Sequence, residues 1–214
     1  MRPGRITGAQ QRALRDLWPR FGVDFGAEVL DLDQLFGRSA PRTLEIGFGN
    51  GEHLLECASA APDSDFIGIE VHRPGVGHLL LGAAQAGIRN LRVLAHDAVE
   101  VLELQIPPSS LDALHLLFPD PWPKKRHHKR RIVTARFAQL VASRLKSGAR
   151  IHLATDWEPY ALQMLDVLDA CGALANCVPA GGFLDYSMAR TATRFERRGE
   201  RLGHRVRELL YEHR

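Results

Sequence analysis

A carboxylate and an aromatic residue follow an apolar segment and alternate with prolines. Residues 111–118 are mostly apolar and favour a strand, and the three prolines of residues 119–123 prevent the strand from continuing. Asp120 and Trp122 therefore lie in a stiff turn where that strand stops. A carboxylate fixed at such a point can stabilise positive charge that develops on a bound group.

The turn leads into a basic run, residues 124–131, with six Lys/Arg, two His and no acid. Such a run is typical of a solvated face or of a nucleic-acid contact, and the run alone leaves both open. The formal net charge of the chain is only +3, so affinity for a polyanion must come from local patches. The junction of the run with a carboxylate turn is rarer, and it indicates a functional site.

A second candidate site is the glycine loop that follows a predicted strand over residues 43–46. Gly47, Gly49 and Gly51 allow a ligand to approach the backbone at a helix N-terminus. The spacing G-x-G-x-G fails the dinucleotide fingerprint at its third glycine, and the loop lacks the lysine of a phosphate loop. S-adenosylmethionine presents an ammonium and no phosphate, and Glu45 could accept from that ammonium. The sequence therefore predicts S-adenosylmethionine as cofactor.

Two more acids end the next predicted strands. Glu70 lies where an acid commonly binds ribose hydroxyls, a feature shared with NAD sites. Asp97 precedes a short helix and has Glu100 three residues on, which is a capping-box pattern. Asp97 could also accept from an adenine amino group, and both interpretations stay open.

These residues need strands that end at one edge of a sheet. Strands alternate with helical patterns from Arg42 onward, which predicts a doubly wound α/β fold with a mostly parallel sheet and helices on both faces. Asp156 is predicted to cap a helix that ends at Ala170, and Gly148 to close the preceding helix. The predicted strands are residues 43–46, 66–71, 91–95, 111–118, 151–154, 173–178 and 190–198.

Residues 1–40 are predicted to form a basic N-terminal appendage. Thr7 can cap a short helix that runs through Trp18 and is ended by Pro19. No apolar run approaches 18 residues, and the N-terminus lacks the apolar core of a signal peptide. The three cysteines form no zinc-site spacing and suggest reduced thiols. We therefore expect a cytoplasmic protein with no membrane segment and no metal.

Four segments together resemble the bacterial tRNA (guanine-N7-)-methyltransferase (TrmB) family: residues 44–51, 118–127, 154–160 and 193–199. The resemblance runs in order from Leu44 to Leu209. It implies a Rossmann-like class I methyltransferase domain over residues 41–214 that uses S-adenosylmethionine. The implied partner is tRNA, and the implied target is the guanosine at position 46 of its variable loop.

The resemblance also implies roles for individual residues. Those expected at the cofactor, beside the loop glycines, are Glu45, Glu70, Asp97 and Asp120. Those expected at the substrate are Lys124, Asp156, Thr193, Arg194, Phe195 and Glu196. Those expected on RNA are Arg126, His127, His128, Lys129, Arg130 and Arg131. At Arg194 the family usually has Lys, and the change keeps the charge but alters the contact geometry.

Guanine N7 is an acceptor that carries no proton, so its methylation needs no general base. Positive charge moves onto the purine, and a carboxylate that accepts from its N1–H or N2–H₂ would stabilise the transition state. Asp120, Asp156 and Glu196 are the candidates. The base must also leave its stack, and Trp122 or Phe195 could receive it.

Two alternatives remain at this stage. Amino-group methylases end their fourth strand in Asp/Asn-Pro-Pro-aromatic, one proline away from Asp120-Pro121-Trp122. In those enzymes the carboxylate accepts a proton from an amine. The other alternative is a non-catalytic RNA-binding protein that keeps a cofactor fold. The intact glycine loop argues against it, as do Glu70 and Asp120.

Overall fold

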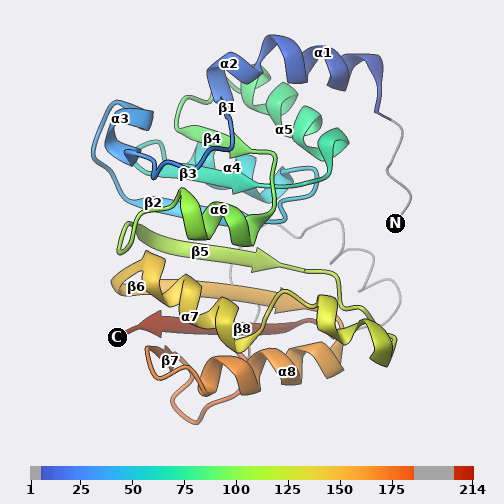
Figure 1. Ribbon diagram of the computed structural model, residues 1–214, viewed down its shortest axis with the longest axis vertical. Helices are drawn as coiled ribbons and strands as arrows, with labels where there is room; N and C mark the ends of the chain where they lie inside the picture. Colours follow the sequence, from blue (N-terminus) through green and yellow to red (C-terminus); the bar gives the residue numbers. More distant parts are fainter. Residues whose placement is uncertain (1–5, 186–204) are drawn as a thin grey trace. The chain divides into compact units, whose positions relative to one another are not determined.

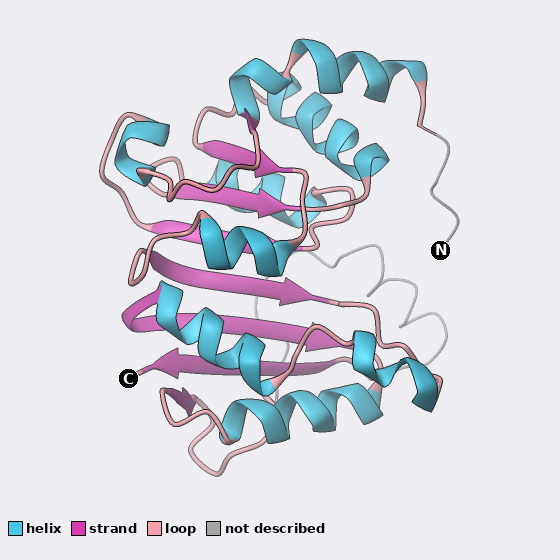
Figure 2. Ribbon diagram, viewed as in Figure 1, coloured by secondary structure: helices cyan, strands magenta, loops and turns pink. Residues whose placement is uncertain are grey.

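The computed structural model describes residues 6–185 and 205–214 (Figures 1 and 2). The chain divides into two compact units, Met1–Pro107 and Pro108–Arg214. The predicted domain boundary near residue 40 stays a prediction. The predicted strand over residues 190–198 lies outside the described residues.

The first unit is built on parallel strands in the order β1-β4-β3-β2. Their bounds are β1 Gly22–Val23, β2 Arg42–Ile46, β3 Asp65–Ile69 and β4 Leu91–Leu94. Every residue of β3 is buried, as expected for a parallel strand that is covered on both faces. β1 was not predicted, because two residues carry too little pattern to read.

Helices cover both faces of these strands. Their bounds are α1 Gly8–Asp16, α2 Trp18–Phe21, α3 Leu32–Phe36, α4 Glu52–Ala60, α5 Arg73–Gln85 and α6 Ala98–Leu104. Figure 1 shows α4 behind the strands and α6 in front of them. Leu54 of α4, Leu79 of α5 and Leu102 of α6 are fully buried, so each helix uses its apolar face to build the core.

The N-terminal segment belongs to this core. Thr7 caps α1 in a capping box with Gln10, which confirms the predicted start. Pro19, however, lies in the first turn of α2 and does not end a longer helix. Ala13 and Phe21 are buried in the same cluster as α5 residues. The apolar face of α1 thus packs residues 8–23 into the core of the first unit.

The second unit combines parallel and antiparallel strands in the order β5-β6-β8-β7. Their bounds are β5 Leu111–Leu117, β6 Leu145–Thr155, β7 Leu174–Asn176 and β8 Arg207–His213. β5 and β6 are parallel, whereas β8 is antiparallel to both of its neighbours. The helices among its described residues are the 3₁₀ helix η1 Lys125–Arg130, α7 Ala135–Arg144 and α8 Glu158–Asp169.

The predicted α/β class with mostly parallel pairing is confirmed. Two further local expectations are wrong. Gly148 lies inside β6 with φ 77° and does not close a helix. Asp156 is not the N-cap of α8: that position is Trp157, whose N–H donates to Thr155 Oγ1 at 3.2 Å.

Candidate active site

The glycine loop connects β2 to α4 in a backbone shape that other residues rarely adopt. Gly47, Gly49 and Gly51 have φ of 70°, 59° and 80°, which lie in the left-handed region. Gly51 is the N-cap of α4. A Cβ at Gly47 would meet nothing within 4 Å, so the loop is open to a ligand there. This geometry is consistent with the predicted role of the three glycines.

Helix α5 packs directly on this loop. A Cβ on Gly75 would lie 2.0 Å from the Gly49 carbonyl oxygen, so the helix approaches as closely as glycine allows. His78 Nδ1 lies 2.9 Å from the Asn50 carbonyl oxygen. The loop conformation therefore depends on the first turns of α5 as well as on its own glycines.

Glu70 ties the end of β3 to the same loop. Its Oε2 accepts from the Gly49 N–H at 2.9 Å, and its Oε1 accepts from the N–H groups of Val71 and His72 at 2.8 Å. The carboxylate thus lies at the predicted cofactor edge of the first unit. It is positioned by three backbone donors, an arrangement that the sequence did not predict.

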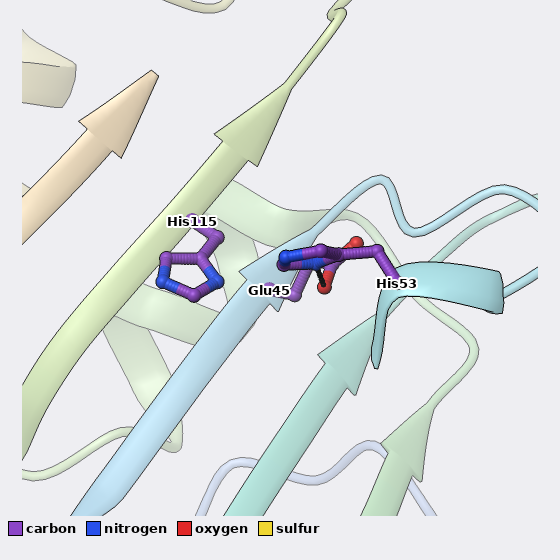
Figure 3. A group of neighbouring side chains, drawn as sticks. All are labelled: Glu45, His53 and His115. Carbon is purple, nitrogen blue, oxygen red and sulfur yellow. Dashed lines mark hydrogen bonds and ion pairs between the residues drawn. The ribbon is translucent and has the colours of Figure 1, made fainter. Parts of the chain in front are cut away.

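Glu45 is 3% exposed and belongs to a buried pair with His53 (Figure 3). His53 Nδ1 lies 2.8 Å from Glu45 Oε2, and His53 Nε2 lies 3.5 Å from the Cys57 sulfur. Burial lowers the pKa of His53, but hydrogen bonds with Cys57 and Glu45 outweigh burial and raise that pKa to about 10. The carboxylate under the loop is therefore paired with an imidazolium at neutral pH.

This pair predicts a pH-dependent stability. The pKa of His53 is raised above its ordinary value of 6.5. The stabilisation that His53 gives to the folded protein is therefore fully present below pH 6.5 and is lost as pH rises toward about 10. We expect the free energy of unfolding of the protein, relative to a His53→Gln variant, to decrease over that range, by at most about 1.4 kcal/mol per pH unit. Urea titrations of both proteins at several pH values measure this difference in the free energy of unfolding. A difference that does not change with pH would contradict the assignment.

Asp97 caps α6, as the sequence predicted. Its Oδ1 accepts from the N–H of Val99 at 2.9 Å and of Glu100 at 3.2 Å. Beside it, the Phe25 ring stacks on the His96 ring with centroids 3.6 Å apart. Sequence reasoning missed this aromatic pair, because Phe25 follows β1, a strand too short to predict. An adenine contact by Asp97 remains a prediction.

In the second unit, the turn after β5 is conformationally strained at both ends. Phe118 has φ 53° and Trp122 has φ 44°, values that are uncommon for residues with bulky side chains. The Phe118 N–H donates to the Ala154 carbonyl oxygen at 2.8 Å, which anchors the turn to β6. Asp120 lies between these two positions and is exposed. The turn thus presents its carboxylate to a ligand.

Most of the basic run forms η1, and its His127 and Arg130 pack on the aromatic residue of the turn. The Trp122 ring contacts the His127 ring edge-on, with centroids 5.7 Å apart. The Arg130 guanidinium lies 4.9 Å above the Trp122 ring. The residues of the run that are exposed are Lys124, Lys125, Arg126, Lys129 and Arg130, and those that are half-buried are His127 and His128. Most of the run is therefore accessible to a polyanion.

Arg131 differs from the rest of the run. It is 4% exposed, its Nε–H donates to the Pro121 carbonyl oxygen at 2.8 Å, and its guanidinium lies 4.7 Å above the Tyr160 ring. A side chain enclosed in this way cannot reach a phosphate in this structure. The predicted RNA contact is therefore corrected for Arg131.

Asp156 lines a cavity at the carboxyl end of β6. The cavity has a volume of about 310 Å³ and is lined by Asp156, Trp157, Glu158, Pro159, Arg205 and Arg207. Arg207 donates to Glu158 Oε1 at 2.6 Å and lies 5.3 Å above the Phe183 ring, which lines a second cavity of about 430 Å³. The sequence did not predict the contributions of Arg207 and Phe183. Thr193, Arg194, Phe195 and Glu196 lie outside the described residues.

Comparison with known proteins identifies the family to which the chain belongs. A family model described as "Putative methyltransferase" matches residues 39–209. The tRNA (guanine-N(7)-)-methyltransferase of Pseudomonas paraeruginosa is 56% identical over 212 residues, which are 99% of this chain and 87% of that protein. The protein of the same name from Halorhodospira halophila is 55% identical over 211 residues, covering 98% and 91%. The chain belongs to the tRNA (guanine-N7-)-methyltransferase family.

Solved structures agree on the fold of this family member. The 16S rRNA methyltransferase KamB has a TM-score of 0.62 at 18% identity, covering 87% of this chain and 95% of its own. TrmN from Thermus thermophilus has a TM-score of 0.55 at 18% identity, covering 96% of this chain and 48% of its own. The Rossmann-like class I methyltransferase fold is therefore confirmed. None of the helices in the described part of the chain combines the length and apolar character that crossing a bilayer requires.

Proposed function

We propose that this protein transfers a methyl group from S-adenosylmethionine to N7 of the guanosine at position 46 in the tRNA variable loop. The observation that carries this proposal is the 56% identity, over 99% of the chain, to a tRNA (guanine-N(7)-)-methyltransferase. The exposed residues of the basic run support an RNA substrate. We place the reaction in the cytoplasm, where tRNA is modified.

The first unit offers a site that fits the cofactor. The open loop at Gly47 lets a ligand approach the backbone, and Glu70 lies at the end of the adjacent strand for the ribose. Asp97 lies at the end of β4 for the adenine. When bound, S-adenosylmethionine supplies an electrophilic methyl group on a sulfonium. We assign binding and orientation of this group to Glu70, Asp97 and the loop glycines. A contact by Glu45 stays a prediction from the family resemblance, because its carboxylate is buried beside His53.

The second unit supplies groups that suit the base and the RNA. Asp120 is exposed between two strained residues, and Asp156 lines the cavity at the end of β6. Because N7 carries no proton, their role is to accept from the guanine edge as positive charge develops there. Arg126, Lys129 and Arg130, with His127 and His128, are assigned to the backbone of the tRNA, and Lys124 to the substrate site beside Asp156. The role of Thr193 to Glu196 at the substrate stays a prediction from the family motif.

The proposal is tested by incubating the purified protein with labelled S-adenosylmethionine and unmodified tRNA, followed by nucleoside analysis. We expect the label in 7-methylguanosine. Label in N6-methyladenosine would indicate an amino-group methylase instead. Binding of cofactor and tRNA without transfer would indicate a non-catalytic RNA-binding protein.

A further inference from the structure

We propose that Arg131 is a positioning residue, whose buried guanidinium fixes the turn that carries Asp120. Its place at the end of the basic run suggested a phosphate contact, but its side chain points inward. The inference rests on the proposed role of Asp120 in the methyl transfer. It identifies Arg131 as the group that keeps the Asp120 carboxylate in place.

The contacts of Arg131 join the turn to helix α8. Its Nε–H donates to the carbonyl oxygen of Pro121, the residue directly after Asp120, at 2.8 Å. Its Nη1 donates to Gln163 Oε1 at 2.5 Å. The planar guanidinium also covers the Tyr160 ring at 4.7 Å. One side chain thus connects the backbone of the turn to two residues of α8.

The α8 side of this connection is itself braced. The Gln163 Nε2 donates to the Val133 carbonyl oxygen at 3.2 Å, and the Val133 N–H donates to the Tyr160 hydroxyl oxygen at 3.2 Å. Tyr160 is fully buried. Each partner of Arg131 on the helix is therefore fixed by a further hydrogen bond. Because its partners are fixed, the guanidinium of Arg131 fixes the position of the turn relative to α8.

The turn needs an external anchor. Positive φ at Phe118 and Trp122 costs on the order of 1–3 kcal/mol for each residue, so the observed shape persists only where surrounding contacts impose it. Prolines at 119 and 121 have no N–H to donate, which removes two possible backbone hydrogen bonds. The Pro121 carbonyl, bonded to Arg131, is one of the remaining points at which the turn can be fastened.

The burial of Arg131 separates this role from RNA binding. At 4% exposure it is shielded from solvent, whereas Lys129, two residues earlier, is exposed. Its Nη2 is buried without a hydrogen-bond partner in the described structure, which costs stability. A lysine at this position would keep the charge but lose the fork that reaches Pro121 and Gln163 at once.

The test compares Arg131→Lys with Lys129→Ala, and with Arg136→Lys as an exposed Arg-to-Lys control on α7. Single-turnover rates at saturating tRNA and cofactor, the salt dependence of tRNA binding and thermal melts are measured for each. We expect Arg131→Lys to lower the rate about 10–100-fold, as a misplaced catalytic group does, with an unchanged salt slope. Lys129→Ala should instead lower the salt slope by about 0.7–0.9.

A second variant covers the case in which Arg131→Lys unfolds. Gln163→Leu removes the partner of Arg131 Nη1 and should lower the rate in the same way. If the double variant folds, its loss of rate should be smaller than the sum of the two single effects, expressed as free energies. A normal rate in a folded Arg131→Lys protein would overturn the proposal, as would a normal rate in Gln163→Leu if Arg131→Lys does not fold. A lowered salt slope with a normal rate would make Arg131 a phosphate contact. Asp120→Asn, measured alongside, distinguishes the two claims, because a normal rate in that variant would refute the role of Asp120 itself.

Discussion

Asp120→Asn is expected to lower the single-turnover rate of methyl transfer by about 10²–10³-fold, which is typical for the loss of one preorganised charged group. Asn is nearly isosteric with Asp but neutral, and it replaces an acceptor oxygen with a donor. The exposed carboxylate sits in a turn that β6, through Phe118, and α8, through Arg131, both restrain. Affinity for tRNA should change far less, because phosphate contacts dominate it.

The alternative is that Asp120 only stabilises its turn. In that case the substitution would cost about 1 kcal/mol of stability and leave the rate nearly intact. Asp112→Asn is a matched control at the other end of β5, where the carboxylate pairs with Lys146 at 2.7 Å. That variant should keep a normal rate. A near-normal rate for Asp120→Asn with a lowered melting temperature would falsify the catalytic role and leave Asp156 and Glu196 as candidates.

Gly75→Ala is expected to weaken binding of S-adenosylmethionine by tenfold or more, or about 1.4 kcal/mol. The added Cβ would lie 2.0 Å from the Gly49 carbonyl oxygen, so the glycine loop or α5 must move. Movement at Gly49 also disturbs its N–H bond to Glu70. Overpacking of this kind costs about 1–3 kcal/mol of folding stability as well.

Titration calorimetry with S-adenosylmethionine or S-adenosylhomocysteine measures this effect without turnover. Gly172→Ala is the matched control, because a Cβ there meets nothing within 4 Å. It should bind the cofactor normally, and tRNA affinity should be the same in both variants. Undiminished cofactor affinity in a folded Gly75→Ala protein would show that the loop does not depend on α5.

The parts of the fold that were predicted correctly are those encoded locally. Strands β2 to β6 follow from apolar runs, and the starts of α1 and α6 follow from Thr7 and Asp97, whose capping acts within three residues. The parts that were missed depend on distant partners. β8 holds the acidic Glu208 in a buried position, which makes sense only beside β6, where Glu208 pairs with buried His152 at 2.8 Å.

The candidate site shows the same limit. The positions of the glycine loop, Glu70 and Asp120 at the ends of strands follow from the order of elements. Their surroundings do not: composition placed Arg131 with the exposed cations, whereas contacts with Pro121 and Gln163 draw it into the protein. Nor could spacing show that α5 approaches the loop at Gly75, because that contact joins segments about 25 residues apart.

The central claim is the methylation of N7 at one guanosine of tRNA, and its most direct test is to map the product. After reaction of a tRNA transcript with the protein, borohydride reduction and aniline treatment cleave the chain at 7-methylguanosine. We predict a single new cleavage at position 46, absent without S-adenosylmethionine and absent when that guanosine is replaced with adenosine. Cleavage at another position, or methyl incorporation that produces no cleavage, would contradict the account.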